Sequence, residues 1–237
     1  MYNDSTKNMK RVNQMEKYIV TTVPPNVSID AVLSELHMEK MDRGSARVKS
    51  VLAILEEALS VAKPIALYSP FKPEISDDAV TINGIKIEEP FVKKMLSGND
   101  IVVPYVASCG VEVDEWSKKY TEVFEQFIVD AIKEMFLDSV RDELKREVKE
   151  KYFAADKVIS AINPGSLNDW PITGQKPLFN MLGGVTDDIG VILKSSLLMI
   201  PTKSVSGILF QTDEAYHNCQ LCPRLDCPGR SAPYKGD

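Results

Sequence analysis

A long amphipathic segment dominates this sequence. Residues 113–152 read VDEWSKKYTEVFEQFIVDAIKEMFLDSVRDELKREVKEKY. Apolar side chains recur in it every three or four residues, and charged residues fill most of the positions between them. The apolar positions are Phe124, Phe127, Ile128, Ala131, Ile132, Met135, Phe136, Val140 and Leu144. The pattern predicts a helix throughout 113–152, and its broad apolar stripe makes this the central helix of the core.

The segments around this helix predict a mixed fold. The expected helices are 28–40, 44–62, 90–98 and 177–184, and the expected strands are 63–71, 100–110, 189–200 and 203–210. Asn83 and Gly84 lie between two short apolar runs and are typical of a type I′ hairpin turn. Residues 160–175 are expected to form a loop. There is no internal repeat and no linker, so residues 1–237 predict a single α+β domain with a mostly antiparallel sheet. Residues 1–62 are expected to form its N-terminal helical segment, and residues 217–237 its cysteine-rich tail.

Composition bounds the function. Hydrophobic residues make up 44% and charged residues 26% of the chain, as in an ordinary soluble globular protein. The net charge of −6 argues against nucleic acid as a partner, because such binding depends on clustered Lys and Arg. No segment approaches the roughly 20 apolar residues of a membrane span, and the first residues do not resemble a signal peptide. We therefore expect a cytoplasmic protein with no membrane partner.

The cysteine-rich tail, residues 217–237, contains HNCQLCPRLDCPGR at 217–230. Cys219, Cys222 and Cys227 have the spacing C-x2-C-x4-C, which lets thiolates converge on one metal ion. Cys109 as a fourth ligand would give an all-cysteine site for an iron–sulfur cluster, whereas His217 would give a site for zinc. A reducing compartment disfavours disulfides. A reduced, unoccupied loop is the alternative interpretation.

The second informative stretch is the loop at 163–171. Gly165 would let the backbone approach a ligand closely, and Asp169 beside Trp170 would suit a cationic group. The alternative is a connecting loop whose tryptophan fills the core, and composition favours that alternative. Asp130, Glu134 and Asp138 share one face of the long helix by their spacing, and such rows are mostly solvated.

Three segments in this order carry a family resemblance. They are NPGSLNDWPI at 163–172, LFNMLGG at 178–184 and IGVILKSSLLMIPTKSVSGILF at 189–210. The chain resembles the activation domain of cobalamin-dependent methionine synthase, which binds S-adenosylmethionine (AdoMet), and more closely the free-standing relatives of that domain. The family has an Arg-x-x-x-Gly-Tyr loop, a helix, and strands that end in Ser-Val-Ser-Gly. The likeness spans about residues 80–216 and is strongest at 203–207.

The resemblance implies a C-shaped domain around a twisted antiparallel sheet. It also implies a role in repair, in which an electron from a donor protein and a methyl group from AdoMet restore methylcobalamin on a corrinoid partner. By position, Gly165 matches the loop glycine, Asp138 a carboxylate that could bind the ligand's ammonium, and Tyr216 a tyrosine that packs on it. Asn163 and Asp169 flank the same loop and complete the expected AdoMet site.

Two positions depart from the family pattern. Ala161 stands where the family has the loop arginine, and Ser166 where it has the tyrosine. A lost guanidinium removes a charge-assisted hydrogen bond to the ligand carboxylate, which is typically worth about 1.5–3 kcal/mol.

Three hypotheses follow from these residues. The chain is an accessory component for AdoMet-dependent reactivation of a cobalamin-dependent methionine synthase or a related corrinoid methyltransferase. Alternatively, it is an iron–sulfur or zinc redox and docking protein for a corrinoid partner, without AdoMet. The third hypothesis is a purely structural interaction module.

Overall fold

A computed structural model describes residues 16–23, 25, 27–227, 230 and 232–235. The parts of the expected N-terminal segment and cysteine tail at 1–15, 24, 26, 228–229, 231 and 236–237 lie outside the described residues. The helices are α1 (Ile29–Glu35), α2 (Ala46–Val61), α3 (Pro90–Leu96), α4 (Val111–Ser117), α5 (Val123–Tyr152), α6 (Gln175–Leu182) and α7 (Val185–Ile189). Short 3-10 helices occur at η1 (Ile172–Gly174) and η2 (Asn218–Gln220).

Three antiparallel sheets accompany these helices. The main sheet has the order β1 (Tyr18–Thr21), β2 (Ile65–Tyr68), β6 (Val103–Ser108), β10 (Ser204–Thr212) and β7 (Val158–Ile162). The second contains β3 (Glu74–Ile75), β4 (Val80–Ile82) and β5 (Ile85–Ile87), and the third pairs β8 (Ile192–Leu193) with β9 (Met199–Ile200). Every strand pair described is antiparallel, so the predicted α+β class is confirmed.

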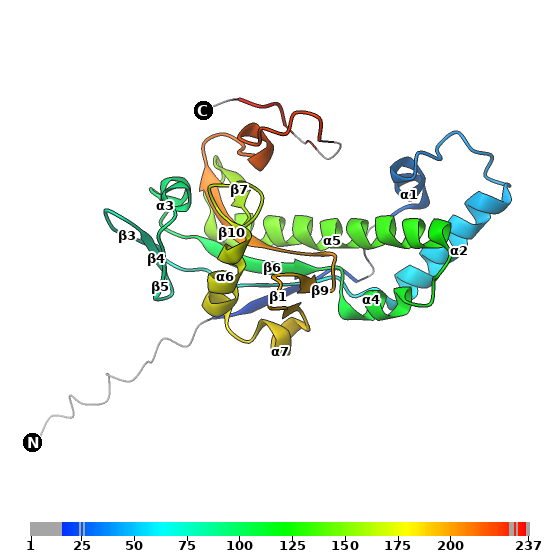
Figure 1. Cartoon of the computed structure of the whole chain (residues 1–237), viewed down its shortest axis with the longest axis horizontal. Helices are drawn as coiled ribbons and strands as arrows, with labels where there is room; N and C mark the ends of the chain where they lie inside the picture. The colour runs from blue at the N-terminus through cyan, green and yellow to red at the C-terminus, as the bar shows by residue number, and fades with distance from the viewer. Residues whose placement is uncertain (1–15, 24, 26, 228–229, 231, 236–237) are drawn as a thin grey trace, which may run out of the picture.

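The long helix covers one face of the main sheet, and α6 and α7 cover the other (Figure 1). The central strand β6 is buried along its whole length, and its alternate residues face the two sides. Val103 and Tyr105 contact the core under α5, whereas Val106 faces α7. Phe136, at the middle of α5, is fully buried. The prediction that this helix is central to the core is therefore confirmed.

The helix predicted over 113–152 is interrupted. It is divided into α4 and α5, and residues 118–122 between them are not helical. At the break, Trp116 and Tyr120 each donate a hydrogen bond of 3.4 Å to Glu57 of α2, and Lys119 pairs with the same carboxylate. These contacts with another helix compete with continued helix and outweigh the local propensity of the sequence.

The strand predicted over 189–200 is wrong. The segment contains the end of α7 and then the short hairpin of β8 and β9, turning at Lys194–Leu198. Leu197 has φ of 67°, which extended backbone does not allow, and its amide donates to the Lys194 carbonyl at 2.9 Å. The polar Lys194-Ser195-Ser196 in the middle of the apolar run is the signal that a turn occurs there.

Three strands were not predicted, namely β1, β7 and the two-residue strand β3, which pairs with β4. β1 lies in the expected N-terminal helical segment 1–62 and pairs with β2, so that this segment contributes to the sheet as well as supplying α1 and α2. β7 overlaps the start of the expected loop 160–175 and pairs with β10. The helix predicted at 28–40 ends at Glu35, shortly before His37 with its φ of 54°. The hairpin at Asn83 and Gly84 is confirmed, with φ of 50° and 73°.

Among the described residues, no helix is long and apolar enough to cross a membrane.

Candidate functional site

A cavity of about 890 Å³ lies between α5, the strands β7 and β10, and the cysteine tail. Four of its residues, Glu134, Leu137, Arg141 and Lys145, are three or four positions apart and share one face of α5. The other lining residues are Val158, Ile159, Ser160, Ala161, Asn163, Ser166, Thr202, Lys203, Ser204, Val205, Leu209, Ala215, Tyr216, His217, Asn218, Cys219, Cys222 and Cys227. The sequence therefore brings its long helix, its loop and its tail to one place.

Asn163 ties the loop after β7 to three other parts of the chain. Its Nδ2 donates to the Tyr105 hydroxyl at 3.0 Å and to the Ser206 carbonyl at 2.9 Å. Its Oδ1 accepts a hydrogen bond of 3.3 Å from Asn218 in the tail. Asn163 lines the cavity as expected, and its hydrogen bonds fix the base of that cavity.

Close packing explains why a glycine, Gly207, ends the Ser-Val-Ser-Gly segment. A Cβ at Gly207 would lie 2.4 Å from Nδ2 of Asn163 and 2.6 Å from the Ile162 carbonyl oxygen. Only a residue without a side chain lets the Asn163 amide reach the backbone of β10. The strongest piece of the resemblance, residues 203–207, thus supports the cavity from beneath.

Gly165 is not one of the described residues that line the cavity. Its φ of 83° and its amide, which donates to the Trp170 carbonyl at 2.7 Å, make it a turn residue. A Cβ at Gly165 would lie 2.7 Å from Cδ1 of Ile172, so the chain itself occupies the space that was expected to admit a ligand. Ser166, the next residue, does line the cavity.

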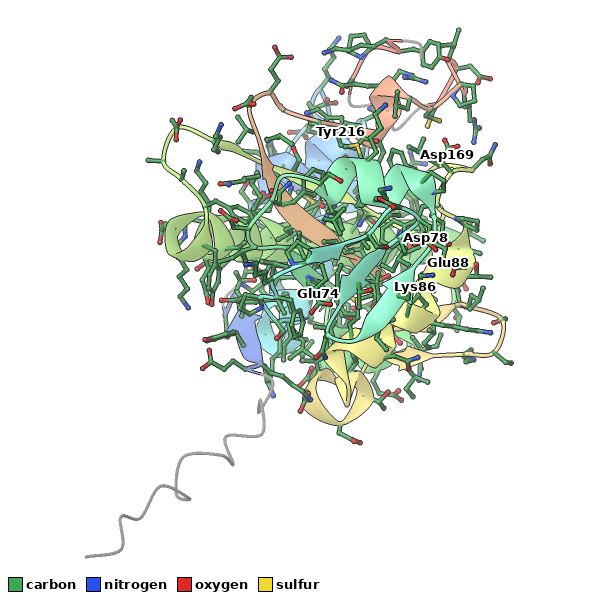
Figure 2. All side chains as sticks on the ribbon, turned by 90° about the vertical axis from the view of Figure 1, so that its left-hand side faces the viewer. Glu74, Asp78, Lys86, Glu88, Asp169 and Tyr216 are labelled. Atoms are coloured by element: carbon green, nitrogen blue, oxygen red, sulfur yellow. The ribbon has the colours of Figure 1, made fainter. Side chains whose placement is uncertain are left out.

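Trp170 fills the core, as the alternative interpretation predicts, because its side chain is fully buried. Its indole therefore cannot offer its face to a cation beside Asp169. Asp169 itself is exposed and lies near Tyr216 (Figure 2).

Tyr216 is half-buried and lines the cavity, as the resemblance implies. Burial, together with the charge of Asp169, raises the pKa of its phenol to about 12. The hydroxyl oxygen is buried and has no hydrogen-bond partner within the described part of the chain. Tyr216 therefore presents an unsatisfied neutral donor beside the cavity.

Asp138 pairs with a residue of the cavity but does not line it. Its Oδ1 accepts a hydrogen bond of 2.7 Å from Nη1 of Arg141. Partial burial raises the pKa of Asp138, and the Arg141 guanidinium opposes that shift. Asp138 thus forms an ion pair with a cavity residue, and its role as a ligand for an ammonium group stays a prediction.

The other two carboxylates of the predicted row are not merely solvated. Asp130 and Glu134 both pair with Lys203 at the start of β10, at 2.9 Å and 3.0 Å. The sequence pattern on one helix could not reveal this partner, because Lys203 lies far along the chain. The sequence analysis also did not identify Arg141 and Lys145 as site residues. Both follow Leu137 at four-residue spacing on the face of α5 that lines the cavity.

The three tail cysteines, Cys219, Cys222 and Cys227, all line the cavity. Arg230 holds their loop: its guanidinium donates to the carbonyl oxygens of Cys219 at 2.6 Å, Cys222 at 2.8 Å and Arg224 at 2.6 Å. Within the residues that the structure describes, no group of three or more His, Cys, Asp or Glu converges to hold a metal ion. The exposed His217 lines the same cavity.

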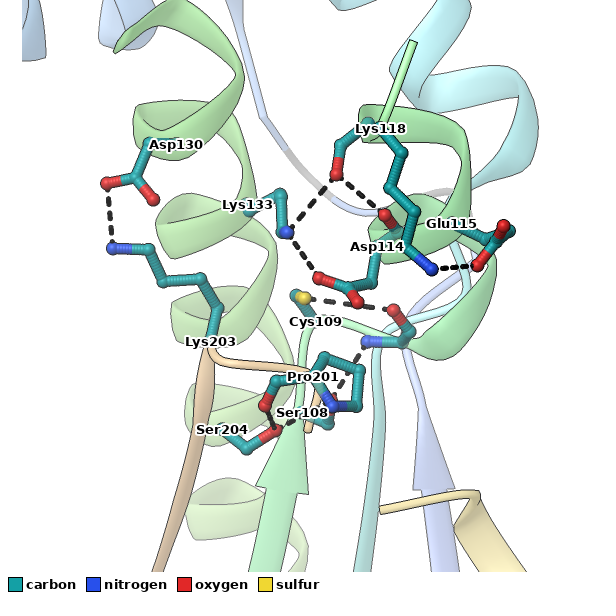
Figure 3. A network of polar contacts seen from close by, with 12 residues as sticks. Ser108, Cys109, Asp114, Glu115, Lys118, Asp130, Lys133, Pro201, Lys203 and Ser204 are labelled. Atoms are coloured by element: carbon teal, nitrogen blue, oxygen red, sulfur yellow. Dashed lines mark hydrogen bonds and ion pairs between the residues drawn. The ribbon is translucent and has the colours of Figure 1, made fainter. Parts of the chain in front are cut away.

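Cys109 is separate from these thiols. It is fully buried at the end of β6, where its Sγ contacts the Gly110 carbonyl at 3.7 Å and Lys133 and Asp114 lie nearby (Figure 3). Burial raises the pKa of the Cys109 thiol to about 12, against a smaller opposing effect of Lys133. A metal ligand must be a thiolate, so this environment disfavours Cys109 as the fourth ligand.

Comparisons with known proteins agree with the fold. The family model "Vitamin B12 dependent methionine synthase, activation domain" matches residues 87–224, which is more than half of the chain. Among solved structures, the chain is similar to one described as the crystal structure of the MetH reactivation domain bound to AdoHcy. The TM-score is 0.62 and the identity 14%, over 86% of this chain and 81% of that one. No curated protein matches the chain.

The matched range includes α5, the loop after β7, β10 and the first two tail cysteines, and so contains most of the cavity. The chain belongs to the family of the activation domain of vitamin B12 dependent methionine synthase.

Proposed function

We propose that this chain binds AdoMet in the cavity between α5, β10 and the tail, and that it serves the reductive reactivation of a cobalamin-dependent methionine synthase or a related corrinoid methyltransferase. Family membership supports the role. The volume of about 890 Å³ lies within the usual range for small-molecule sites, roughly 300–1,000 Å³. The similar solved structure is described as bound to AdoHcy, the demethylated product of AdoMet.

The observation that carries the proposal is a pair of buried polar atoms at residues that line the cavity. Neither the Tyr216 hydroxyl nor Nε of Arg141 has a hydrogen-bond partner within the described residues. Leaving such a group unpaired costs about 1–3 kcal/mol, and a polar ligand in the cavity would remove that cost. The donor set therefore fits a ligand that offers acceptors, such as the carboxylate and ribose of AdoMet.

In this role the chain acts by positioning. One electron from an external donor would reduce cob(II)alamin on the partner to cob(I)alamin. Methyl transfer from the sulfonium of AdoMet would then form the Co–C bond, break the C–S bond and release AdoHcy. The residues of α5 and β10 hold the ligand from one side. Those of the tail cover it from the other, which excludes water from part of the cavity.

A metal centre in the tail does not fit these residues. The three thiols line one cavity but do not converge with a further ligand within the described residues, and Cys109 is buried elsewhere. We therefore assign no electron transfer to the tail, and the electron donor remains a separate partner.

Calorimetric titration of the full chain with AdoMet and AdoHcy tests the binding. We expect saturable heat with one site per chain for both ligands. Ser166→Trp fills the cavity at an exposed lining residue and should abolish this heat, whereas Ser195→Trp, at an exposed turn outside the cavity, should leave it unchanged. The absence of heat from the unmodified chain at millimolar AdoMet would rule the proposal out.

Reactivation is tested separately. A cobalamin-dependent methionine synthase in its inactive cob(II)alamin form is mixed with a chemical reductant and AdoMet labelled in its methyl group. Addition of the chain should increase the label found on cobalamin, and the Ser166→Trp variant should not.

Ala161 and Ser166 favour a second candidate function. Because both lack the groups with which the resembled family grips AdoMet, the chain could dock on a corrinoid partner without binding the ligand itself. Co-purification with a cobalamin-loaded methyltransferase, combined with no calorimetric response to AdoMet, would select this candidate.

A further inference from the structure

A cationic side chain in this cavity would bind the carboxylate of a ligand such as AdoMet. The arginine that the family resemblance leads us to expect for this role is absent. Ala161 lines the cavity from β7 at the position of the family's loop arginine. Its methyl group leaves that part of the wall without charge and without a hydrogen-bond donor. The cation must therefore come from another element.

Three cationic side chains from the described part of the chain, Arg141, Lys145 and Lys203, line the cavity, and they differ in what they already bind. Lys203 is paired with two carboxylates, at 2.9 Å and 3.0 Å. Lys145 forms a long ion pair of 3.8 Å with Asp142. Arg141 makes one hydrogen bond with its guanidinium, from Nη1 to Asp138 at 2.7 Å.

The free edge of Arg141 has the geometry that a carboxylate requires. In a guanidinium, Nε–H and one N–H of Nη2 point in parallel, and together they bind a carboxylate through two hydrogen bonds. Asp138 accepts a hydrogen bond from Nη1, which lies at a different edge of the planar guanidinium. This contact limits the rotation of the group and leaves the edge of Nε and Nη2 open. Nε is buried and unpaired within the described residues, so the open edge is partly removed from water.

Arg141 also lies at the base of the cavity. It is close enough to the buried Tyr105 to oppose the rise in the pKa of that phenol that burial causes. The Tyr105 hydroxyl accepts a hydrogen bond from Asn163, two residues beyond Ala161. Arg141 and Ala161, which stands at the position of the family's arginine, line the same cavity.

We infer that Arg141 binds the α-carboxylate of AdoMet through its Nε and Nη2 edge, with Asp138 as the residue that positions it. The cation that binds the carboxylate thus comes from α5 instead of the end of β7, and the small side chain of Ala161 leaves room for it. This inference rests on the proposed function, because it names the group that recognises one part of the same ligand.

Calorimetry with two ligands tests the inference. AdoMet and decarboxylated AdoMet share the adenosine, the sulfonium and the amine but differ in the carboxylate. Arg141→Met should weaken AdoMet binding about 10- to 100-fold, the usual effect of losing a charge-assisted bidentate contact, and should change the affinity for decarboxylated AdoMet less than about threefold. Arg141→Lys keeps the charge without the fork and should fall between Met and the native residue.

Arg146→Met is the matched control. Arg146 lies on the same helix, pairs with Glu143 and Glu150, and does not line the cavity. Its replacement should leave both affinities unchanged. Circular dichroism and the melting temperature confirm that each variant is folded. If Arg141→Met does not fold, the native chain alone decides, since it should bind AdoMet at least about tenfold more tightly than the decarboxylated ligand.

The outcomes separate the two claims. Equal weakening of both ligands by Arg141→Met, or no weakening of either, overturns the inference while AdoMet binding stands. Equal affinity of the native chain for both ligands overturns it as well. If the native chain binds neither ligand, the proposed function itself fails.

Discussion

The cavity has two walls that are held in different ways. The core wall consists of its residues on α5, β7 and β10, and the other faces of these elements are buried in the hydrophobic core. The tail wall consists of residues 215–227. Among the described residues after β10, only Ala232 is buried, and polar contacts such as those of Arg230 and Asn218 hold the tail in place.

The core wall therefore determines the stability of the domain, whereas the tail wall determines how a ligand reaches the cavity. Apolar burial in the core wall contributes to the free energy of unfolding of the whole domain. Contacts that involve little apolar surface break at low cost, so the tail wall can open while the core stays folded. A ligand could enter from the tail side without global unfolding.

The core wall should show the largest effect. Phe136→Ala removes a fully buried ring from the middle of α5 and should lower the free energy of unfolding by about 3–5 kcal/mol. Urea denaturation measures this change. Phe127→Ala on the same helix is the control, because Phe127 is 58% exposed and should cost far less. Similar losses for the two variants would contradict the packing of α5 described above.

The contact between the core wall and the loop should give the next largest effect. Gly207→Ala forces a methyl group against the Asn163 amide and the Ile162 carbonyl and should destabilise the domain by about 1–3 kcal/mol. AdoMet binding should weaken as well, because Asn163 can no longer reach the backbone of β10. Gly98→Ala serves as the control for stability alone, since no atom lies within 4 Å of the Cβ that it adds, although its φ of 82° brings some strain. Unchanged calorimetry in Gly207→Ala would show that Asn163 does not shape the cavity.

The buried Cys109 in the core predicts how the stability of the protein changes at alkaline pH, and the tail cysteines provide the contrast. The folded state raises the pKa of Cys109 from its ordinary value of 9.0 to about 12, so the stability that the neutral thiol contributes is complete below about pH 9. It is lost progressively as pH rises towards 12, because the unfolded chain ionises first. Urea denaturation at several pH values should show a smaller alkaline decline in Cys109→Ala than in the native chain.

A thiol reagent provides the independent check. Cys219, Cys222 and Cys227 are partly exposed and should react in the native protein, whereas the buried Cys109 should react only after unfolding. Parallel stability curves for Cys109→Ala and the native chain, or rapid reaction of all four thiols, would be incompatible with the burial of Cys109.

The tail wall should show the smallest effect on stability. Arg230→Gln removes the guanidinium that holds four tail carbonyl groups, and the free energy of unfolding should change by no more than about 1 kcal/mol. Hydrogen exchange of the tail amides should nevertheless become faster. Arg224→Gln, at a mostly exposed side chain, is the control and should leave exchange unchanged. A large loss of global stability in Arg230→Gln would mean that the tail belongs to the cooperative core.

Local patterns predicted most of the fold, and long-range contacts account for the errors. The periodicity of 123–152 and the Asn83-Gly84 turn depend on neighbours in sequence, and both are confirmed. The break before α5 depends on contacts of Trp116, Tyr120 and Lys119 that no local pattern encodes. β1 and β7 are short strands whose partners lie 40 or more residues away, and local propensity gives them little weight.

The candidate site was partly accessible from the sequence. The family resemblance indicated Asn163 and Tyr216, and the spacing of the tail indicated Cys219, Cys222 and Cys227; all five line the cavity. Arg141 was missed because one arginine among many charges on a helix carries no signal until its neighbours in space are known. Gly165 was interpreted as space for a ligand, whereas its turn geometry and Ile172 explain it.

The sequence around Asn163 also affects how readily this side chain is chemically modified. Spontaneous deamidation of asparagine begins when the backbone nitrogen of the next residue attacks the side-chain amide, and that nitrogen must carry a hydrogen. Pro164 follows Asn163 and has none, so this route is closed at the base of the cavity. Asn83, followed by Gly84 in an exposed turn, has the open route. Old preparations should therefore accumulate new negative charge at Asn83 on the distant hairpin and retain an intact amide at Asn163.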